Sequence, residues 1–137
     1  MKAKNSWIKT ILVQLILIIT ASVLFALSFP NPLIENGIPF FAWFAYIPIL
    51  LVIQKNSLLP CIGWGAIYGY LSYSLSNFWL MTFDTFSGVV VYSIYLVYMV
   101  VVFLLMKLAQ FFYPKKYYLV QWVIWLGYEY LRIQGFL

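Results

Sequence analysis

The chain contains no histidine and a single cysteine, Cys61, among its 137 residues. One cysteine cannot form a disulfide bond within the chain. Without histidine, neither a Cys/His metal site nor a histidine-based catalytic relay can be assembled. The sequence therefore predicts no bound metal and no cofactor, and it lacks most of the groups that hydrolytic chemistry ordinarily uses.

Charged residues are scarce as well, at 8% of the chain, with eight basic residues against three acidic ones and a net charge of +5. The acidic residues are Glu35, Asp84 and Glu129. Nucleic-acid binding requires clustered, exposed lysine and arginine, which this sequence does not contain. We therefore expect no nucleic-acid partner and interpret the basic residues as signals of membrane topology.

Apolar residues are abundant, with 66% hydrophobic residues, 22% aromatic residues and a mean hydropathy of +0.97. A soluble monomer of this size could not bury so much apolar surface. The composition predicts an all-α, polytopic membrane helix bundle, formed as a single domain by residues 1–137. Its first expected partner is the phospholipid membrane.

Apolar runs between polar or proline-containing segments predict about five transmembrane helices. We expect them at about residues 11–27, 39–53, 60–83, 89–106 and 117–133. The second span is short and contains Pro48, so a tilted helix and a partly re-entrant one both remain open. The first span has a cleaved signal peptide as its alternative, although its apolar run is longer than that of a usual signal sequence.

The basic residues set an orientation for these spans. With a cytoplasmic amino terminus, the inner loops hold seven of the eight: Lys2, Lys4, Lys9, Lys55, Lys107, Lys115 and Lys116. Arg132 alone lies outside, together with Glu35 and Asp84. This distribution obeys the positive-inside rule, and it predicts a carboxyl terminus on the outer face, which is periplasmic in a bacterium.

The segment from Pro60 to Asp84 combines membrane length with a face of small and polar residues. At about 100° per residue, this face spans roughly 80° of arc, with Trp79 on the same side; its members are Cys61, Gly65, Gly69, Ser72 and Ser76. Gly65 and Gly69 have the GxxxG spacing that lets helix backbones approach closely in a bilayer. We interpret the face as a helix-packing surface, with a substrate-contacting groove as the alternative.

Several segments of the chain together form a pattern. In order they are a lysine-bearing first helix with a Phe-Pro turn, a short aromatic helix ending in IPILLVI, Gly63-Trp64-Gly65 with Gly69, Asn77-Phe78-Trp79-Leu80, and Glu129-Tyr130-Leu131-Arg132 with Gly135-Phe136. Over essentially its whole length the chain resembles the amino-terminal membrane region of bacterial apolipoprotein N-acyltransferase. The most specific element is WLGYEYLRIQGF, which looks like a shortened form of that family's E-W-L-R-x-x-x-x-x-G-F segment.

The resemblance implies an inner-membrane acyltransferase of lipoprotein biosynthesis, which moves an acyl chain from phospholipid to the amino-terminal diacylglyceryl-cysteine of a lipoprotein. In that family the Glu, Lys and Cys triad belongs to a periplasmic nitrilase-like domain that follows the membrane helices. No residue of this chain can be matched to the triad, so we expect no catalytic residue and no activity of the chain alone. The prolipoprotein would be a partner only through that missing domain, and we expect a truncated, split or interrupted longer protein.

A bundle that supplies phospholipid to a site above the membrane needs a lateral opening near the outer leaflet. The residues expected to contact lipid or headgroup there are Asn77, Trp79, Asp84, Glu129 and Arg132. Glu129 and Arg132, at i and i+3, favour a structural ion pair. Arg132 could equally bind a phosphate through its planar guanidinium group.

Two other classes of protein remain open. A small non-catalytic membrane protein, or a subunit that packs against a partner through the Gly65 and Gly69 face, is the main alternative. A transporter or channel is disfavoured because ionisable residues are nearly missing from the middle of every expected span.

Overall fold

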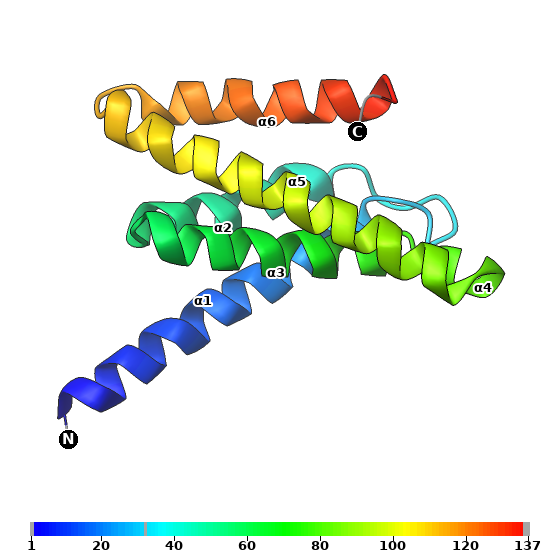
Figure 1. Cartoon of the computed structure of the whole chain (residues 1–137), viewed down its shortest axis with the longest axis horizontal. Coiled ribbons are helices and arrows are strands. Elements are labelled where there is room, and N and C mark those ends of the chain that lie inside the picture. Colours follow the sequence, from blue (N-terminus) through cyan, green and yellow to red (C-terminus); the bar gives the residue numbers. More distant parts are fainter. Residues whose placement is uncertain (1, 32, 136–137) are drawn as a thin grey trace.

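The computed structural model describes residues 2–31 and 33–135, with the backbone alone for residues 2–6. This described part forms six helices and no strand: α1 (Lys2–Leu27), α2 (Phe41–Lys55), α3 (Leu58–Ser76), α4 (Leu80–Phe83), α5 (Thr85–Phe112) and α6 (Tyr117–Ile133). α1 packs against α2 and α3, α3 packs against α5, and α5 packs against α6. The amino-terminal part of α1 extends away from the other helices (Figure 1). The expected all-α membrane bundle is confirmed.

Two of the described helices are long and apolar enough to cross a bilayer, namely Trp7–Leu27 within α1 and the whole of α5. α2 is apolar but has only 15 residues. Length and composition therefore support two spans, and the expected count of about five is not confirmed. Large apolar side chains lie on the outer surface, with Ile16 62% and Val123 68% exposed. Such a surface fits lipid tails and marks a membrane protein.

The helices differ from the expected spans on both sides of Asn77. The expected span at 60–83 is divided, because α3 ends at Ser76 and the short α4 begins at Leu80. The Asn77 side chain donates a hydrogen bond of 3.3 Å to the carbonyl oxygen of Tyr73 and so satisfies the last turn of α3. The residues between the expected spans at 60–83 and 89–106 form the start of α5, where the Asp84 carboxylate accepts a hydrogen bond of 2.8 Å from the backbone N–H of Ser87.

Two glycines of α3 bring this helix against α5. A Cβ atom on Gly65 would lie 2.9 Å from the carbonyl oxygen of Met99, and one on Gly69 would lie 2.8 Å from the carbonyl oxygen of Tyr95. Neither position has room for a larger residue unless the helices separate. Close backbone approach of this kind is how membrane helices gain van der Waals contact without help from the hydrophobic effect.

The loop between α1 and α2 folds back over the end of α1. Its turn is closed by Asn31, whose side-chain oxygen accepts hydrogen bonds of 3.0 Å from the backbone N–H groups of Leu33 and Ile34. Gly37 has a positive φ of 62°, and a Cβ there would lie 2.5 Å from the carbonyl carbon of Phe29. Only glycine fits this backbone conformation and this approach. The loop thereby holds Phe29 beside the carboxyl-terminal end of α1.

α6 is attached to the bundle in a different way. Among the described helices, only α5 brings its backbone close to that of α6. Aromatic side chains fill the space between α6 and the other helices: the Trp122 and Trp125 rings lie 4.6 Å and 5.1 Å from the Tyr46 ring of α2, and Trp125 lies 6.4 Å from Tyr68 of α3. A layer of rings therefore separates α6 from α2 and α3.

Candidate functional site

A cavity of about 270 Å³ lies where the carboxyl-terminal ends of α1, α3 and α6 meet. Its lining residues are Phe25, Phe29, Pro30, Tyr73, Ser76, Asn77, Trp79 and Arg132. Three of the five residues expected to contact lipid are in this set, although Arg132 is separated from Asn77 and Trp79 by more than fifty positions in the sequence. We call this space the arginine cavity.

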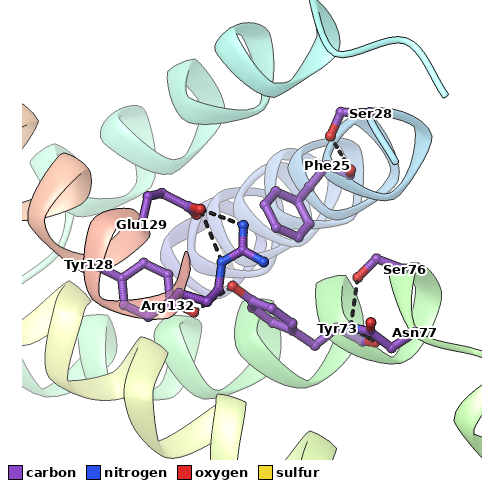
Figure 2. A network of polar contacts seen from close by, with 8 residues as sticks. All are labelled: Phe25, Ser28, Tyr73, Ser76, Asn77, Tyr128, Glu129 and Arg132. Atoms are coloured by element: carbon purple, nitrogen blue, oxygen red, sulfur yellow. Dashed lines mark hydrogen bonds and ion pairs between the residues drawn. The ribbon is translucent and has the colours of Figure 1, made fainter. Parts of the chain in front are cut away.

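The charged group of the arginine cavity is held by its own helix. The Nε and Nη2 atoms of Arg132 donate hydrogen bonds of 3.0 Å and 2.6 Å to Oε2 of Glu129, one turn earlier in α6. The Phe29 ring centroid lies 5.6 Å from the Arg132 guanidinium carbon, a cation–π distance. The two side chains of the ion pair are only 21% and 22% exposed. Figure 2 shows the guanidinium group of Arg132 between Glu129, Phe25 and Tyr73.

Two tyrosines connect α3 and α6 beside this ion pair. The hydroxyl groups of Tyr73 and Tyr128 are hydrogen-bonded to each other, and both side chains are buried. The Tyr73 ring also stacks on Tyr95 of α5, with centroids 3.8 Å apart. A tyrosine hydroxyl buried in a bundle needs a partner of this kind. This hydrogen bond holds α6, and with it Arg132, in a fixed position relative to the carboxyl-terminal end of α3.

A second cavity, of about 240 Å³, lies between α2 and α6. Its lining residues are Phe25, Phe29, Ala42, Trp43, Tyr46, Trp122, Trp125, Leu126 and Glu129. We call it the aromatic cavity. It shares the Phe25 and Phe29 rings with the arginine cavity, so the two spaces adjoin at the end of α1.

Polar atoms in the wall of the aromatic cavity are unsatisfied. The hydroxyl of Tyr46 and the Oε1 atom of Glu129 are buried, and neither has a hydrogen-bond partner within the described residues. Burial of a polar group without a partner is unfavourable by a few kcal/mol, roughly 1–3 by mutational measurement. Both residues belong to the lining of the aromatic cavity, and both groups lack a polar partner within the described residues.

The fifth expected lipid contact, Asp84, lies outside both cavities and caps α5. Hydrogen bonds from the hydroxyl and then from the backbone N–H of Ser87 lower the pKa of the Asp84 carboxyl below its ordinary value. The carboxylate remains exposed. Its role in the structure is that of a helix cap.

The five residues of the small and polar face of α3 are all buried: Cys61, Gly65, Gly69, Ser72 and Ser76. Only Ser76 lines the arginine cavity. The Cys61 thiol lies 3.8 Å from the carbonyl oxygen of Ile53, enclosed by the bundle. It is not placed to act as a nucleophile toward a substrate in either cavity.

Several residues of the two cavities were not among the sequence-based candidates. Phe25, Phe29 and Tyr73 belong to the arginine cavity, and Trp43 and Tyr46 belong to the aromatic cavity. The sequence contains one signal for the site, the spacing of Trp122, Trp125, Glu129 and Arg132 along one side of α6. It contains no comparable signal on α1 or α2.

The arrangement joins a guanidinium group to an aromatic, largely apolar space inside a membrane protein. Such a site suits an amphiphile, because a phosphate pairs well with arginine and an apolar chain packs against the rings. The fold and the cavities thus define a membrane helix bundle that carries a buried arginine beside two adjoining cavities rich in aromatic side chains.

Comparison with known proteins gives the family. A family model described as the apolipoprotein N-acyltransferase N-terminal domain matches residues 21–137, and the chain belongs to this family. Apolipoprotein N-acyltransferase 1 of Treponema denticola is 37% identical over 124 residues, which cover 90% of this chain and 23% of that protein. The protein of the same name from Treponema pallidum is 34% identical over 133 residues, covering 97% of this chain and 24% of that protein. The chain thus spans about a quarter of the length of these relatives. No solved structure matches it.

Proposed function

We propose that this chain is the membrane-embedded amino-terminal part of an apolipoprotein N-acyltransferase, which transfers an acyl chain from phospholipid to the amino-terminal diacylglyceryl-cysteine of lipoproteins. Its place is the bacterial inner membrane, which it crosses several times with the amino terminus cytoplasmic and the carboxyl-terminal end of α6 periplasmic. The observation that carries the proposal is the adjoining pair of cavities, one with Arg132 and one lined by aromatic rings.

The two cavities divide a phospholipid donor between them. The phosphate pairs with Arg132, whose Nη1 makes no hydrogen bond to the described residues and whose charge is held in place by Glu129. One acyl chain enters the aromatic cavity past Phe25 and Phe29. The Tyr46 hydroxyl, which lacks a partner within the described residues, donates to an ester carbonyl of the lipid.

In this proposal the 137 residues hold and orient the donor, and the catalytic groups lie elsewhere. The single thiol of the sequence, Cys61, is enclosed between α3 and the end of α2. Purified alone, the chain is expected to transfer no acyl groups to a lipopeptide amine. Robust transfer by the chain alone would contradict this division of labour.

The alternative of a subunit that packs against a separate partner through Gly65 and Gly69 is disfavoured by the structure. Both glycines are buried against α5 of the same chain. A partner helix could reach them only by displacing α5.

A chimera tests the proposal. The segment of the Treponema denticola relative that aligns with this chain is replaced by this chain, and acyl transfer from phospholipid to a diacylglyceryl lipopeptide is measured. We expect activity in the chimera and a loss of roughly ten-fold or more in Arg132→Gln, in line with removal of a charge-assisted phosphate contact. Lys115→Gln, which removes one positive charge at the opposite end of α6, is the matched control and should retain activity.

A second measurement does not depend on the chimera. A phospholipid with a photoreactive group in its acyl chain should label the wild-type chain at the aromatic cavity, and Trp125→Ala should redirect or abolish that labelling. Labelling confined to the outer surface of α5 would contradict the proposed donor site, whatever the activity of the chimera.

A further inference from the structure

A third cleft lies at the other end of the bundle, where α1 passes the carboxyl-terminal end of α2. It has a volume of about 350 Å³ and is lined by Lys9, Thr10, Val13, Gln14, Leu17 and Lys55. The proposed donor site uses none of these residues. We call it the lysine cleft.

The lysine cleft carries positive charge without a neighbouring carboxylate. The ammonium groups of Lys9 and Lys55 come from two different helices, and neither forms an ion pair within the described residues. All three acidic residues of the chain lie toward the opposite end: Glu35 in the loop before α2, Asp84 before α5 and Glu129 late in α6. α2 alone, at about 1.5 Å per residue, puts roughly 20 Å between Lys55 and the loop that holds Glu35. That distance exceeds the Debye length of about 8 Å in physiological salt.

Another basic residue at this end, on α5, is already engaged. Lys107 of α5 donates hydrogen bonds of 2.6 Å to Oε1 of Gln110 and 3.2 Å to the carbonyl oxygen of Ile53, near the end of α2. Lys107 thus satisfies a carbonyl group of α2. The lysines of the cleft have no such partner in the part of the chain that the structure describes, and their charges repel each other unless an anion enters.

The deeper part of the cleft is suited to the rest of a lipid. Gln14 is only 4% exposed, and it belongs to the lining of the cleft. It can donate to a phosphate or glycerol oxygen. Beyond it, Val13 and Leu17 continue the cleft with apolar side chains along α1, inside the segment long enough to span a bilayer. The cleft thus has lysine side chains at its opening and apolar side chains further in. This arrangement matches a lipid headgroup followed by an acyl chain.

We propose that the lysine cleft binds the phosphate of an anionic phospholipid in the leaflet that surrounds the amino-terminal half of α1. Lys9 and Lys55 pair with the phosphate, and the Gln14 carboxamide donates a hydrogen bond to it from the deeper part of the cleft. One acyl chain lies along Val13 and Leu17. A net-negative lipid is preferred over a zwitterionic one, because no carboxylate stands near the cleft to receive an ammonium group. The site acts as a lipid anchor for the α1–α2 hairpin and is separate from the donor site at the other leaflet.

Native mass spectrometry of the full chain in detergent tests the site, with phosphatidylglycerol and phosphatidylcholine as competing probes. A lysine near an anionic headgroup contributes a factor of about five in affinity, so Lys9 and Lys55 together should give a preference for phosphatidylglycerol of about 25-fold. Lys9→Gln with Lys55→Gln should remove that preference. Lys9→Arg with Lys55→Arg should retain it.

The control is the pair Lys115→Gln and Lys116→Gln, which changes the net charge equally at the loop between α5 and α6 and should leave the preference intact. Equal losses in both double variants would mean that general surface charge attracts the lipid, and would overturn the proposal. Displacement of the lipid by millimolar inorganic phosphate would overturn it in favour of a free-phosphate site. Thermal unfolding of each variant in detergent shows whether its bundle is intact, and the arginine variant provides the comparison if a glutamine variant unfolds.

Discussion

The hydroxyl oxygens of Tyr73 in α3 and Tyr128 in α6 lie 2.5 Å apart, joined by a hydrogen bond between residues 55 positions apart in the sequence. Only α5 approaches the backbone of α6 among the described helices, so this bond is a direct polar link from α6 to α3. It stands beside Arg132, the charged group of the proposed donor site (Figure 2).

Replacing Tyr128 by Phe should destabilise the bundle by roughly 1–2 kcal/mol, because the Tyr73 hydroxyl then remains buried without a partner. Tyr73→Phe should have a similar effect, and the double variant should be little worse than either single one. A double-mutant cycle from unfolding in detergent should give a coupling of about 0.5–1.5 kcal/mol. Tyr118→Phe, at a side chain that is 49% exposed, is the control. Additive effects would show that the two hydroxyls do not interact.

The close approach of α3 and α5 predicts unequal responses to the same substitution at different glycines. Gly69→Ala should destabilise the bundle by roughly 1–3 kcal/mol, because the new Cβ would lie 2.8 Å from the Met99 Cβ. Gly65→Leu and Gly69→Leu should be worse. Gly63→Ala meets no atom within 4 Å and should be neutral or stabilising by up to about 1 kcal/mol. Equal thermal stabilities for the Gly63 and Gly69 variants would show that the close approach of α3 to α5 does not stabilise the bundle.

The Glu129–Arg132 pair should matter more for stability than an exposed ion pair. Glu129→Gln leaves the guanidinium group without its carboxylate in a mostly buried place, and we expect a loss of roughly 1–3 kcal/mol, below the 3–5 kcal/mol of a fully buried pair. The double variant Glu129→Gln with Arg132→Gln should recover part of that loss. Glu35→Gln, in the loop between α1 and α2, is the control in the same detergent unfolding measurement. No recovery in the double variant would show that the two residues stabilise the fold independently.

The cap at the start of α5 should respond to pH. Since the hydrogen bonds from Ser87 lower the folded-state pKa of Asp84, its contribution to stability is fully present above the unfolded-state pKa of about 4. It is lost as the pH falls through the lowered folded-state value. The difference in melting temperature between the wild type and Asp84→Ala should therefore be positive at pH 7 and shrink below pH 4. A melting-temperature difference that stayed constant down to pH 2 would show that the ionised form of the Asp84 carboxylate is not needed for the stabilising effect of the cap.

Hydropathy was enough to predict the helical bundle, because a chain this apolar can satisfy its backbone in a bilayer only by forming helices or a closed barrel. It did not show the break at Asn77. Apolar residues continue through Trp79 and Leu80, so the run gives no local signal that α3 ends there. The hydrogen bonds from the Asn77 backbone N–H and side chain to the carbonyl oxygen of Tyr73, at the end of α3, are details of local geometry.

The site was partly predictable for a similar reason. Trp122, Trp125, Glu129 and Arg132 lie on one side of α6, and a periodicity within one helix can be read from the sequence. The residues of the other helices and loops that face this side of α6 cannot be identified from the sequence in this way. Phe29 is placed by a loop that requires Gly37, and Tyr73 is paired with a residue three helices later, so both depend on tertiary packing.

The layer of rings between α6 and the helices before it sets the order in which the protein can assemble. α6 is synthesised after α1 to α5, and those five helices can insert and pack without it, since no backbone contact with α1, α2 or α3 awaits its arrival within the described helices. When α6 docks, Trp122, Trp125, Glu129 and Arg132 enter together and complete both cavities in one step. A nascent chain still lacking α6 therefore has neither cavity of the proposed donor site, and the capacity to hold a donor lipid there appears only once α6 has docked.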